Sequence, residues 1–526
     1  MPFLRLRKTI QFVIVAVAAA TLTAFLNGRL TESPNAKDGY QNLSAAYYLA
    51  HHRVFSLSQN LKPSNYREPL PILTLALYIR MHPDLYGLSL KEINEGPAVV
   101  TVKQHNLLWA FLCMLGIGLL VLSAIKDRLI GTTAAVIAIW LTYFLFLQRT
   151  EIINRTYTEI EAATLLVWFS FCLVRALQTR MPVWFVAAGI LLGALSLTKA
   201  AFLYVGVGLI IAITVLYAVW RPLWPRWRAL TLSALMAVSM AVIVLPWMVR
   251  NLIQFGSFEI TQRGGTILML RANYDKMNQD EYLGALYHFT RASFLKRRLG
   301  NYLGFSERDL EAGGRLQRLN RSGSASFAAS DLAAERAGRP EDAVSFYRAA
   351  RAEQRRLTKH FAENGVDNPS HKADRELKRR ALNMFLDKPL QHLKTSALFM
   401  WRGIPKIGNS LTTTLALMAV WLMALVGTLR RDAIMLGIAL LPVGAFIFFS
   451  LTSHFSPRLS APMIPHLVIA LTVTAAWILL WLIRMPGPAR SLRSNQFLRR
   501  APKETYISVV RFDDGPSEDH SASLRS

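Results

Sequence analysis

The chain has 526 residues, of which 52% are hydrophobic, and its mean hydropathy is +0.28. This balance excludes an ordinary soluble globule and is typical of a chain that uses lipid as part of its solvent. The formal net charge of +27 would suggest nucleic acid in a soluble protein, but Lys and Arg are expected in excess in cytoplasmic loops and beside anionic lipid headgroups. Since no nucleic-acid-reading motif is present, we expect membrane lipid and no nucleic acid among its partners.

The first residues, MPFLRLRKTIQFVIVAVAAATLTAFL, combine a basic start with a long apolar run. No clear small-x-small cleavage site follows, so this pattern predicts a retained signal anchor. The two cysteines, Cys113 and Cys172, both fall inside apolar runs, which indicates neither a disulfide framework nor a thiolate metal site.

Apolar runs long enough to cross about 30 Å of hydrocarbon recur along the chain. They predict an all-α polytopic membrane protein with about ten or more transmembrane helices. The ten predicted spans are Thr9–Phe25, Asn106–Ile125, Leu129–Leu147, Ile160–Leu177, Val183–Thr198, Ala200–Trp220, Leu230–Leu245, Leu411–Leu429, Ile434–Leu451 and Met463–Ile483.

The short loops predict the orientation, because Lys and Arg accumulate on the cytoplasmic side. With ten spans, the basic N-terminus, the basic short turns and the basic segment after Arg484 all fall on one side. Both termini are therefore expected in the cytoplasm. The segments predicted to face outward are 27–104, 148–159, 250–410 and 453–462.

Four regions follow from these assignments. We predict an N-terminal transmembrane module over 1–250, whose first outer loop (27–104) is catalytic, and a small helical extracytoplasmic domain over 251–392. Residues 393–484 are predicted to hold an interfacial amphipathic helix and the C-terminal spans, and 485–526 a cytoplasmic tail without assigned structure. The basic face of the helical domain is either a site for anionic lipid or glycan, or a solvated helix surface.

Ionisable residues gather at the outer ends of the predicted spans. Placing a charge near the hydrocarbon costs free energy, so such residues are functional candidates. The first outer loop holds Asp38 and Glu68. Alternatives remain open, since Asp38 could cap a helix, Glu68 could complement a helix dipole, and each cation could anchor at the headgroups. The other candidates are Arg67, Arg149, Arg155, Glu159, Lys199, Arg250, Arg271 and Arg458.

Several short motifs occur in a fixed order along the chain. An Asp follows the first span, Arg67-Glu68-Pro69 opens an apolar run, and Gly-x-x-x-Leu-Thr-Lys ends at Lys199; Leu-Pro-Trp-x-x-Arg-Asn and Pro-Arg-Leu-x-x-Pro come later. This order resembles the integral-membrane glycosyltransferases of the GT-C fold, of the protein O-mannosyltransferase and aminoarabinose-transferase type (glycosyltransferase family 39). The resemblance covers Thr9 to about Gly264 and about Asp374 to Ile483, and leaves out the central outer domain.

The resemblance implies a polyprenyl-phosphate-linked sugar as donor, inversion at the sugar carbon, and a glycan, lipid or protein as acceptor. Asp38 is then the catalytic base with Glu68 as its partner, while Lys199, Arg250 and Arg458 hold the donor phosphate. Arg67, Arg149, Arg155, Glu159 and Arg271 are further candidates for the cleft. Many relatives have a second acid where this chain has Gly39, so we assign no metal ligands and leave a divalent metal open.

Two other functions remain possible from the sequence. One is a polysaccharide polymerase or ligase with a lipid-diphosphate donor, and the other is a lipid or solute transporter. The sequence contains no Walker, dinucleotide-binding, HExxH or GxSxG motif, which disfavours a nucleotide-sugar donor. We expect an integral protein of the bacterial inner membrane with its active site on the periplasmic side.

Overall fold

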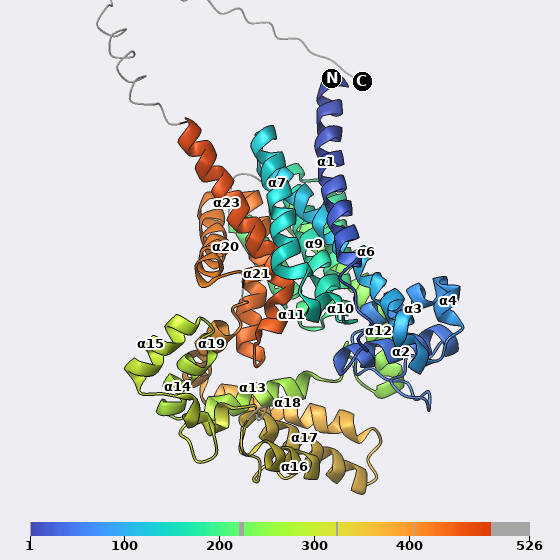
Figure 1. Ribbon diagram of the computed structural model, residues 1–526, viewed down its shortest axis with the longest axis vertical. Coiled ribbons are helices and arrows are strands. Elements are labelled where there is room, and N and C mark those ends of the chain that lie inside the picture. Colours follow the sequence, from blue (N-terminus) through green and yellow to red (C-terminus); the bar gives the residue numbers. More distant parts are fainter. Residues whose placement is uncertain (1, 220–225, 322–324, 406, 485–526) are drawn as a thin grey trace, which may run out of the picture. The chain divides into compact units, whose positions relative to one another are not determined.

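The structure is a computed structural model that describes residues 2–219, 226–321, 325–405 and 407–484, and all its regular elements in these ranges are helices (Figure 1). The predicted tail at 485–526 and the end of the predicted span at Trp220 lie outside the described residues. The chain divides into two units after Ala476. The site described below lies wholly in the first.

Eight helical segments are long and apolar enough to cross a membrane, judged over the described residues. The predicted spans at 183–198 and 200–220 correspond to two shorter apolar helices, α10 (Pro182–Thr198) and α11 (Ala201–Val219). The all-α polytopic architecture is therefore confirmed. The eight segments are Lys8–Asn27, Gly96–Ala124, Arg128–Leu147, Glu159–Thr179, Trp227–Phe255, Ser410–Arg430, Ala433–Thr452 and Pro457–Arg484.

Helix α9 (Glu159–Thr179) is the most enclosed of these segments, with 83% of its apolar window buried. It contacts α6 (Gly96–Ala124), α10 and α21 (Ala433–Thr452). Glycines permit close approach nearby: a Cβ on Gly189 of α10 would lie 2.3 Å from the Met236 carbonyl oxygen of α12 (Arg226–Phe255). Small residues serve the same purpose in membrane helix pairs generally. The first residue of α9, Glu159, is therefore held on a rigid frame.

The first outer segment folds into short helices with their own apolar core. These are α2 (Asp38–His52), α3 (Pro69–Met81), α4 (Pro83–Tyr86) and α5 (Leu90–Ile93). Leu43, Phe55, Ile72 and Leu75 are buried in this core. The packing fixes the starts of α2 and α3, where Asp38 and Glu68 lie.

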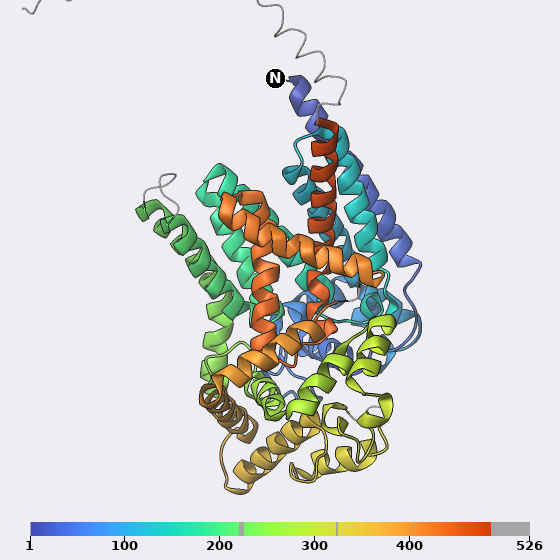
Figure 2. The ribbon, with the colours of Figure 1, turned by 90° about the vertical axis from the view of Figure 1, so that its left-hand side faces the viewer.

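The segment between α12 and α20 (Ser410–Arg430) forms what we call the helical domain (Figure 2). Its members are α13 (Gly264–Asn273), α14 (Gln279–Phe289), α15 (Ser293–Leu303), α16 (Ala328–Ala337), α17 (Phe346–Glu363), α18 (Pro369–Asp387) and α19 (Pro389–Arg402). The Asp374 carboxylate of α18 accepts hydrogen bonds from the Gly265 and Thr266 amides, each at 2.9 Å. An anion there complements the N-terminal dipole of α13, so α13 and α18 are locked together.

Arg271 of α13 is fully buried and joins this domain to the spans. Its guanidinium donates to the Asp275 carboxylate at 2.6 Å and to the Ser450 carbonyl of α21 at 3.1 Å. It also donates to hydroxyls of α19, Thr395 at 2.9 Å and Ser396 at 2.8 Å. Arg271 is thus a buried structural link, and the structure does not bring it to Asp38.

Replacing Arg271 with Met should destabilise the protein by about 3–5 kcal/mol, because removing one partner leaves the buried Asp275 charge without its guanidinium. Thermal unfolding of the detergent-purified protein, followed by tryptophan fluorescence, would measure the loss. Arg297→Met is the matched control, since Arg297 is exposed on α15. Equal melting temperatures for the two variants would contradict the role of Arg271.

Candidate active site

Arg458 joins the two carboxylates at the centre of the site. It lies on α22 (Pro457–Ser460), where its Nε donates to Glu159 Oε1 at 2.8 Å and its Nη1 donates to Asp38 Oδ2 at 2.8 Å. The guanidinium also lies over the Tyr157 ring, 4.0 Å from its centroid. Because the fork of Arg presents several donors in one plane, a single side chain ties together α2, α9 and α22.

A second arginine holds the other oxygen of Asp38. Arg67 Nη2 donates to Asp38 Oδ1, and Arg67 Nε donates to Gln41 Oε1 at 3.0 Å. The Arg67 side chain is 5% exposed, whereas that of Asp38 is 32% exposed. The carboxylate of Asp38 therefore remains accessible while both of its oxygens accept hydrogen bonds from arginines.

Glu159 and Lys199 form the inner part of the site. Lys199 follows the last residue of α10, and its Nζ lies 3.7 Å from Glu159 Oε1. Glu159 is 2% exposed, and its other oxygen, Oε2, is buried without a hydrogen-bond partner. This oxygen is an acceptor that the described protein residues leave unsatisfied, so a polar substrate group or water would be favoured beside it.

Positive charge exceeds negative charge around Asp38. Burial alone would raise the pKa of Asp38, but the charges of Arg67 and Arg458 outweigh it and lower the pKa to about 2. Arg263 adds a further cation: burial opposes its charge, but Tyr66, Glu68 and Asp38 together keep the pKa of its guanidinium above the usual value. Asp38 is therefore ionised at neutral pH, and the surplus of cations suits an anionic group.

Arg263 was not among the residues singled out from the sequence, and it connects Asp38 with Glu68. It precedes α13, and its guanidinium lies 4.6 Å from the centroid of the Tyr66 ring. Beside it is a cavity of about 70 Å³ with polar and aromatic walls. Glu68 stands before the first residue of α3 and makes no capping hydrogen bond, and Asp38 is inside the first turn of α2.

The remaining candidates lie apart from this network. Arg250 stacks 4.4 Å from the centroid of the Trp247 ring and donates to the Ser64 carbonyl at 3.1 Å, so it supports the first outer segment. Arg155 donates to the Pro34 carbonyl. Arg149 lies within electrostatic range of Arg291, and Arg271 has the structural contacts given above. The structure thus brings together Asp38, Arg67, Glu159, Lys199 and Arg458.

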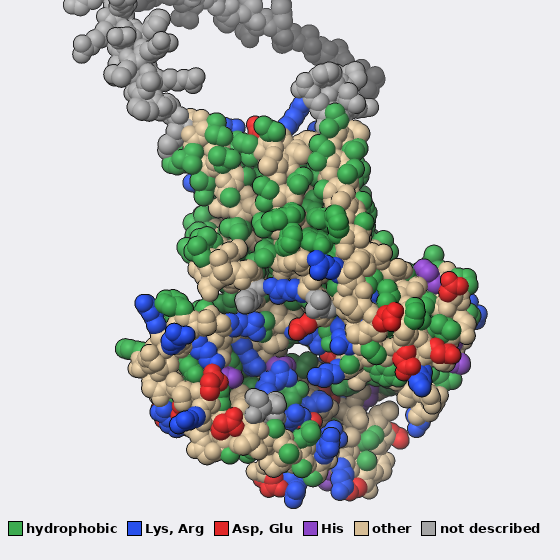
Figure 3. Space-filling model, viewed as in Figure 1, with side chains coloured by type: hydrophobic (Ala, Val, Ile, Leu, Met, Phe, Trp, Pro, Cys, Tyr) green, Lys and Arg blue, Asp and Glu red, His purple; other side chains and the backbone are tan. Residues whose placement is uncertain are grey.

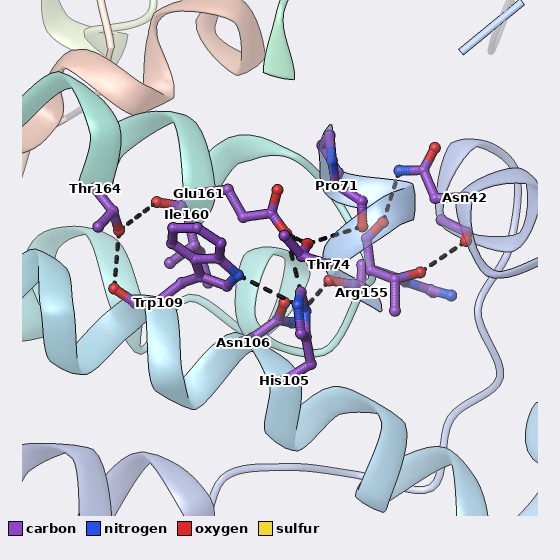
Figure 4. Close-up of polar contacts among 12 residues, drawn as sticks. Asn42, Pro71, Thr74, His105, Asn106, Trp109, Arg155, Ile160, Glu161 and Thr164 are labelled. Carbon is purple, nitrogen blue, oxygen red and sulfur yellow. Dashed lines mark hydrogen bonds and ion pairs between the residues drawn. The ribbon is translucent and has the colours of Figure 1, made fainter. Parts of the chain in front are cut away.

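A buried polar cluster next to this network was also not singled out from the sequence; it is formed by Thr74, His105, Trp109 and Glu161 (Figure 4). Glu161 Oε1 accepts from Thr74 Oγ1 at 3.3 Å and lies 3.9 Å from His105 Nδ1. Trp109 Nε1 donates to His105 Nε2 at 3.3 Å, so a neutral His105 carries its proton on Nδ1, facing Glu161. The available signal was Glu161 inside the predicted span Ile160–Leu177, with His105 directly before the predicted span that begins at Asn106, since ionisable residues at such positions are functional candidates.

The site as formed does not fit a divalent metal. Both oxygens of Asp38 accept from arginines, and Arg458 stands between Asp38 and Glu159. Within the part of the chain that the structure describes, no group of three or more His, Cys, Asp or Glu side chains could hold a metal ion. Hard cations require several oxygen ligands, so we derive no step through a metal.

No family model matches the chain, and no curated protein sequence matches it. Among solved structures, it is similar to the archaeal oligosaccharyltransferase AglB from Archaeoglobus fulgidus in complex with an inhibitory peptide and a dolichol-phosphate, at 14% identity and a TM-score of 0.44, over 95% of this chain and 53% of that chain. It is also similar to ArnT from Cupriavidus metallidurans bound to undecaprenyl phosphate, at 15% identity and a TM-score of 0.32, over 88% of this chain and 78% of that chain. The apo state of ArnT gives a TM-score of 0.34. The chain therefore spans about half the length of AglB, and the function is argued below from its own residues.

The ion pairs of Asp38 predict a pH dependence of stability. Because its pKa falls from 3.8 to about 2 on folding, its contribution is present above pH 4 and is lost as the pH falls through 2. We expect an effect of about 1 kcal/mol after solvent screening. Between pH 6 and pH 3, the melting temperature of wild type should fall more steeply than that of Asp38→Asn.

Asp84→Asn is the control, because Asp84 is exposed on α4 of the same segment. It should reproduce the wild-type pH profile. Parallel profiles for wild type and Asp38→Asn would show that these ion pairs do not stabilise the fold.

Proposed function

We propose that the protein is a glycosyltransferase that moves a sugar from a polyprenyl-phosphate-linked donor to an acceptor on the outer face of the membrane, with inversion at the sugar carbon. The observation that carries the proposal is the network in which Arg458 bridges Asp38 and Glu159, with Arg67 and Lys199 beside them. It combines an accessible carboxylate with a surplus of cations at the ends of membrane spans. These are the groups that transfer from a lipid phosphate requires.

The donor phosphate would be held by Arg458 and Lys199. When the sugar departs, the phosphate oxygen takes the electron pair of the broken carbon–oxygen bond and gains negative charge. Fixed cations stabilise such charge more strongly in a partly dry site than in water, and Arg can contact two phosphate oxygens at once. Arg250 contacts Ser64 and Trp247, so we assign it to positioning the first outer segment.

Asp38 would act as the general base for the acceptor. With a pKa of about 2 it is a weak base while both arginines hold it, since an effective base has a pKa near the working pH. A bound donor phosphate would share the charge of Arg67 and Arg458, and the pKa of Asp38 would rise. Donor binding would thereby prepare the base, which limits proton transfer to the loaded enzyme.

The reaction would be a single displacement. The acceptor hydroxyl oxygen attacks the sugar carbon from the face opposite the phosphate, its proton passes to Asp38, and the polyprenyl phosphate leaves. One new carbon–oxygen bond replaces the one that breaks, so the configuration at that carbon inverts. Glu68, which lies within range of Arg263, would orient the acceptor, which is a glycan, lipid or protein.

The proposed location follows from the basic short loops, which favour the cytoplasm for both termini. The active site is then periplasmic if the membrane is a bacterial inner membrane. A transporter is disfavoured by the position of the charges, because transport sites lie near the middle of the bilayer whereas Asp38 and Arg458 are outside or at the first turn of a span.

Replacing Asp38 with Asn should lower the transfer rate by about 10²–10⁴-fold, the usual contribution of a positioned base. The assay would follow sugar release from an undecaprenyl-phosphate-linked donor by the full chain in detergent or proteoliposomes. Asp84→Asn serves as the control in the same segment and should keep the wild-type rate. Full activity in a correctly inserted Asp38→Asn protein would exclude Asp38 as the base.

The same preparation separates the proposed donor from a lipid-diphosphate donor. We expect turnover with the undecaprenyl-monophosphate sugar and at least about tenfold less with the diphosphate, since a tenfold difference needs only 1.4 kcal/mol of differential stabilisation. Faster turnover with the diphosphate would instead support a polysaccharide polymerase or ligase.

A further inference from the structure

A second group of basic side chains lies apart from Asp38, and we call it the cationic cluster. Arg402 ends α19, and its guanidinium lies 4.6 Å from the centroid of the Phe289 ring and 5.7 Å from that of Phe399. Next to Phe289 in the sequence is His288, and Arg291 follows at the α14–α15 connection. The members of the cluster are His288, Arg291, Arg402 and His454, with Arg149 and Arg321 in electrostatic range.

Three nitrogen atoms of this cluster are buried without a hydrogen-bond partner. They are Nη1 of Arg402, Nδ1 of His288 and Nδ1 of His454. Nearly all buried polar atoms in native proteins are hydrogen-bonded, so each exception calls for a ligand, ion or water. Arg402 Nη1 is a donor, and a neutral histidine can place its proton on Nδ1. Each of the three atoms could therefore bind an acceptor group or a water.

The electrostatics of the cluster point in the same direction. Burial, followed by the charges of Arg402 and Arg149, lowers the pKa of Arg291. Burial and then Arg402, Arg321 and Arg263 lower the pKa of His454 to about 3. Cations that depress one another's pKa values are mutually repulsive, and an anion between them would relieve that repulsion.

Carboxylates do little to neutralise this group. Burial, then Arg402 and Lys296, lowers the pKa of His288 to about 4, and Glu307 opposes this only as the smallest contribution. The Glu307 carboxylate already accepts from Lys296 and, at 3.2 Å, from the Tyr287 hydroxyl. The Asp38 site differs in that Arg67 and Arg458 are hydrogen-bonded to carboxylates there.

The cluster lies where membrane spans end. Arg149 follows the span ending at Leu147, His454 lies between the spans ending at Thr452 and beginning at Pro457, and Arg402 precedes α20. Figure 3 shows Lys and Arg side chains gathered around a hollow between the apolar part of the molecule and the helical domain. Phosphate groups of lipids lie at this depth of a membrane.

We propose that the cationic cluster binds a phosphoanion, with Arg402 and Arg291 contacting its oxygens, at a site separate from that of Asp38. Phosphate is favoured over a carboxylate because it offers more acceptor oxygens to converging donors. The charges that act on Asp38 are those of Arg67, Arg458 and Arg263, and none of the cluster's cations is among them. Arg263 acts on both Asp38 and His454, and so links the two groups electrostatically. The contacts proposed for Arg402 and Arg291 do not involve Asp38, so they stand even if the proposed transferase activity fails.

Two sources share this chemistry, a soluble phosphate or diphosphate group and an anionic phospholipid headgroup. The experiment uses the full chain in neutral detergent with inorganic pyrophosphate, measured by calorimetry, and in nanodiscs containing phosphatidylglycerol or phosphatidylcholine, with retained lipid counted by native mass spectrometry. The variants are Arg402→Gln and Arg291→Gln. Arg297→Gln, an exposed arginine of α15, is the control with the same change in net charge.

We expect both cluster variants to weaken pyrophosphate binding or to lose retained phosphatidylglycerol by at least tenfold, while Arg297→Gln behaves as wild type. A loss confined to pyrophosphate identifies a soluble phosphoanion, and a loss confined to phosphatidylglycerol identifies a headgroup. Since Arg291 is exposed, its replacement tests binding even if Arg402→Gln fails to fold. Unchanged binding of both probes in Arg291→Gln, or equal losses in Arg297→Gln, would overturn the proposal.

Discussion

The double hydrogen bond of Arg458 to Asp38 and Glu159 is the interaction on which the rest of the site depends. Arg458 is 420 positions from Asp38 and 299 positions from Glu159 in the chain. Without a cation between them, an accessible carboxylate and a buried one would repel each other, and the nearly dry Glu159 would be costly to keep ionised. Because Glu159 begins α9, the most enclosed span, Arg458 also fixes Asp38 relative to the membrane frame.

This arrangement has a chemical consequence. The arginines that make the site rigid also hold Asp38 in a weakly basic state, with a pKa of about 2. An anion that entered the site would compete with Asp38 for the guanidinium groups of Arg67 and Arg458. Stability and reactivity therefore draw on the same ion pairs, which explains why Arg67 is buried beside Gln41 while Asp38 stays partly exposed.

Sequence patterns predicted the spans well because lipid forces the backbone to satisfy its own hydrogen bonds, so long apolar runs form helices. They also singled out Asp38, Glu159, Lys199 and Arg458, which the structure brings together, because ionisable residues at span ends are rare. They could not separate these from Arg271, which has the same chemistry but is enclosed by α13, α19 and α21. Partner identity depends on tertiary packing over hundreds of residues, and that information is absent from any local pattern. Arg263 was missed for the same reason.

The two groups of basic residues differ in their hydrogen-bond partners, and this difference determines how each group would bind an anion. Around Asp38, Arg67 and Arg458 are already hydrogen-bonded to carboxylates, so an anion that binds to either arginine must displace an existing bond. Around Arg402, three buried nitrogen atoms have no hydrogen-bond partner, so an anion could bind there without displacing a carboxylate. The first arrangement favours exchange during turnover and the second favours stable occupancy. The proposed glycosyltransferase would use both arrangements, the first to release a ligand and the second to retain one.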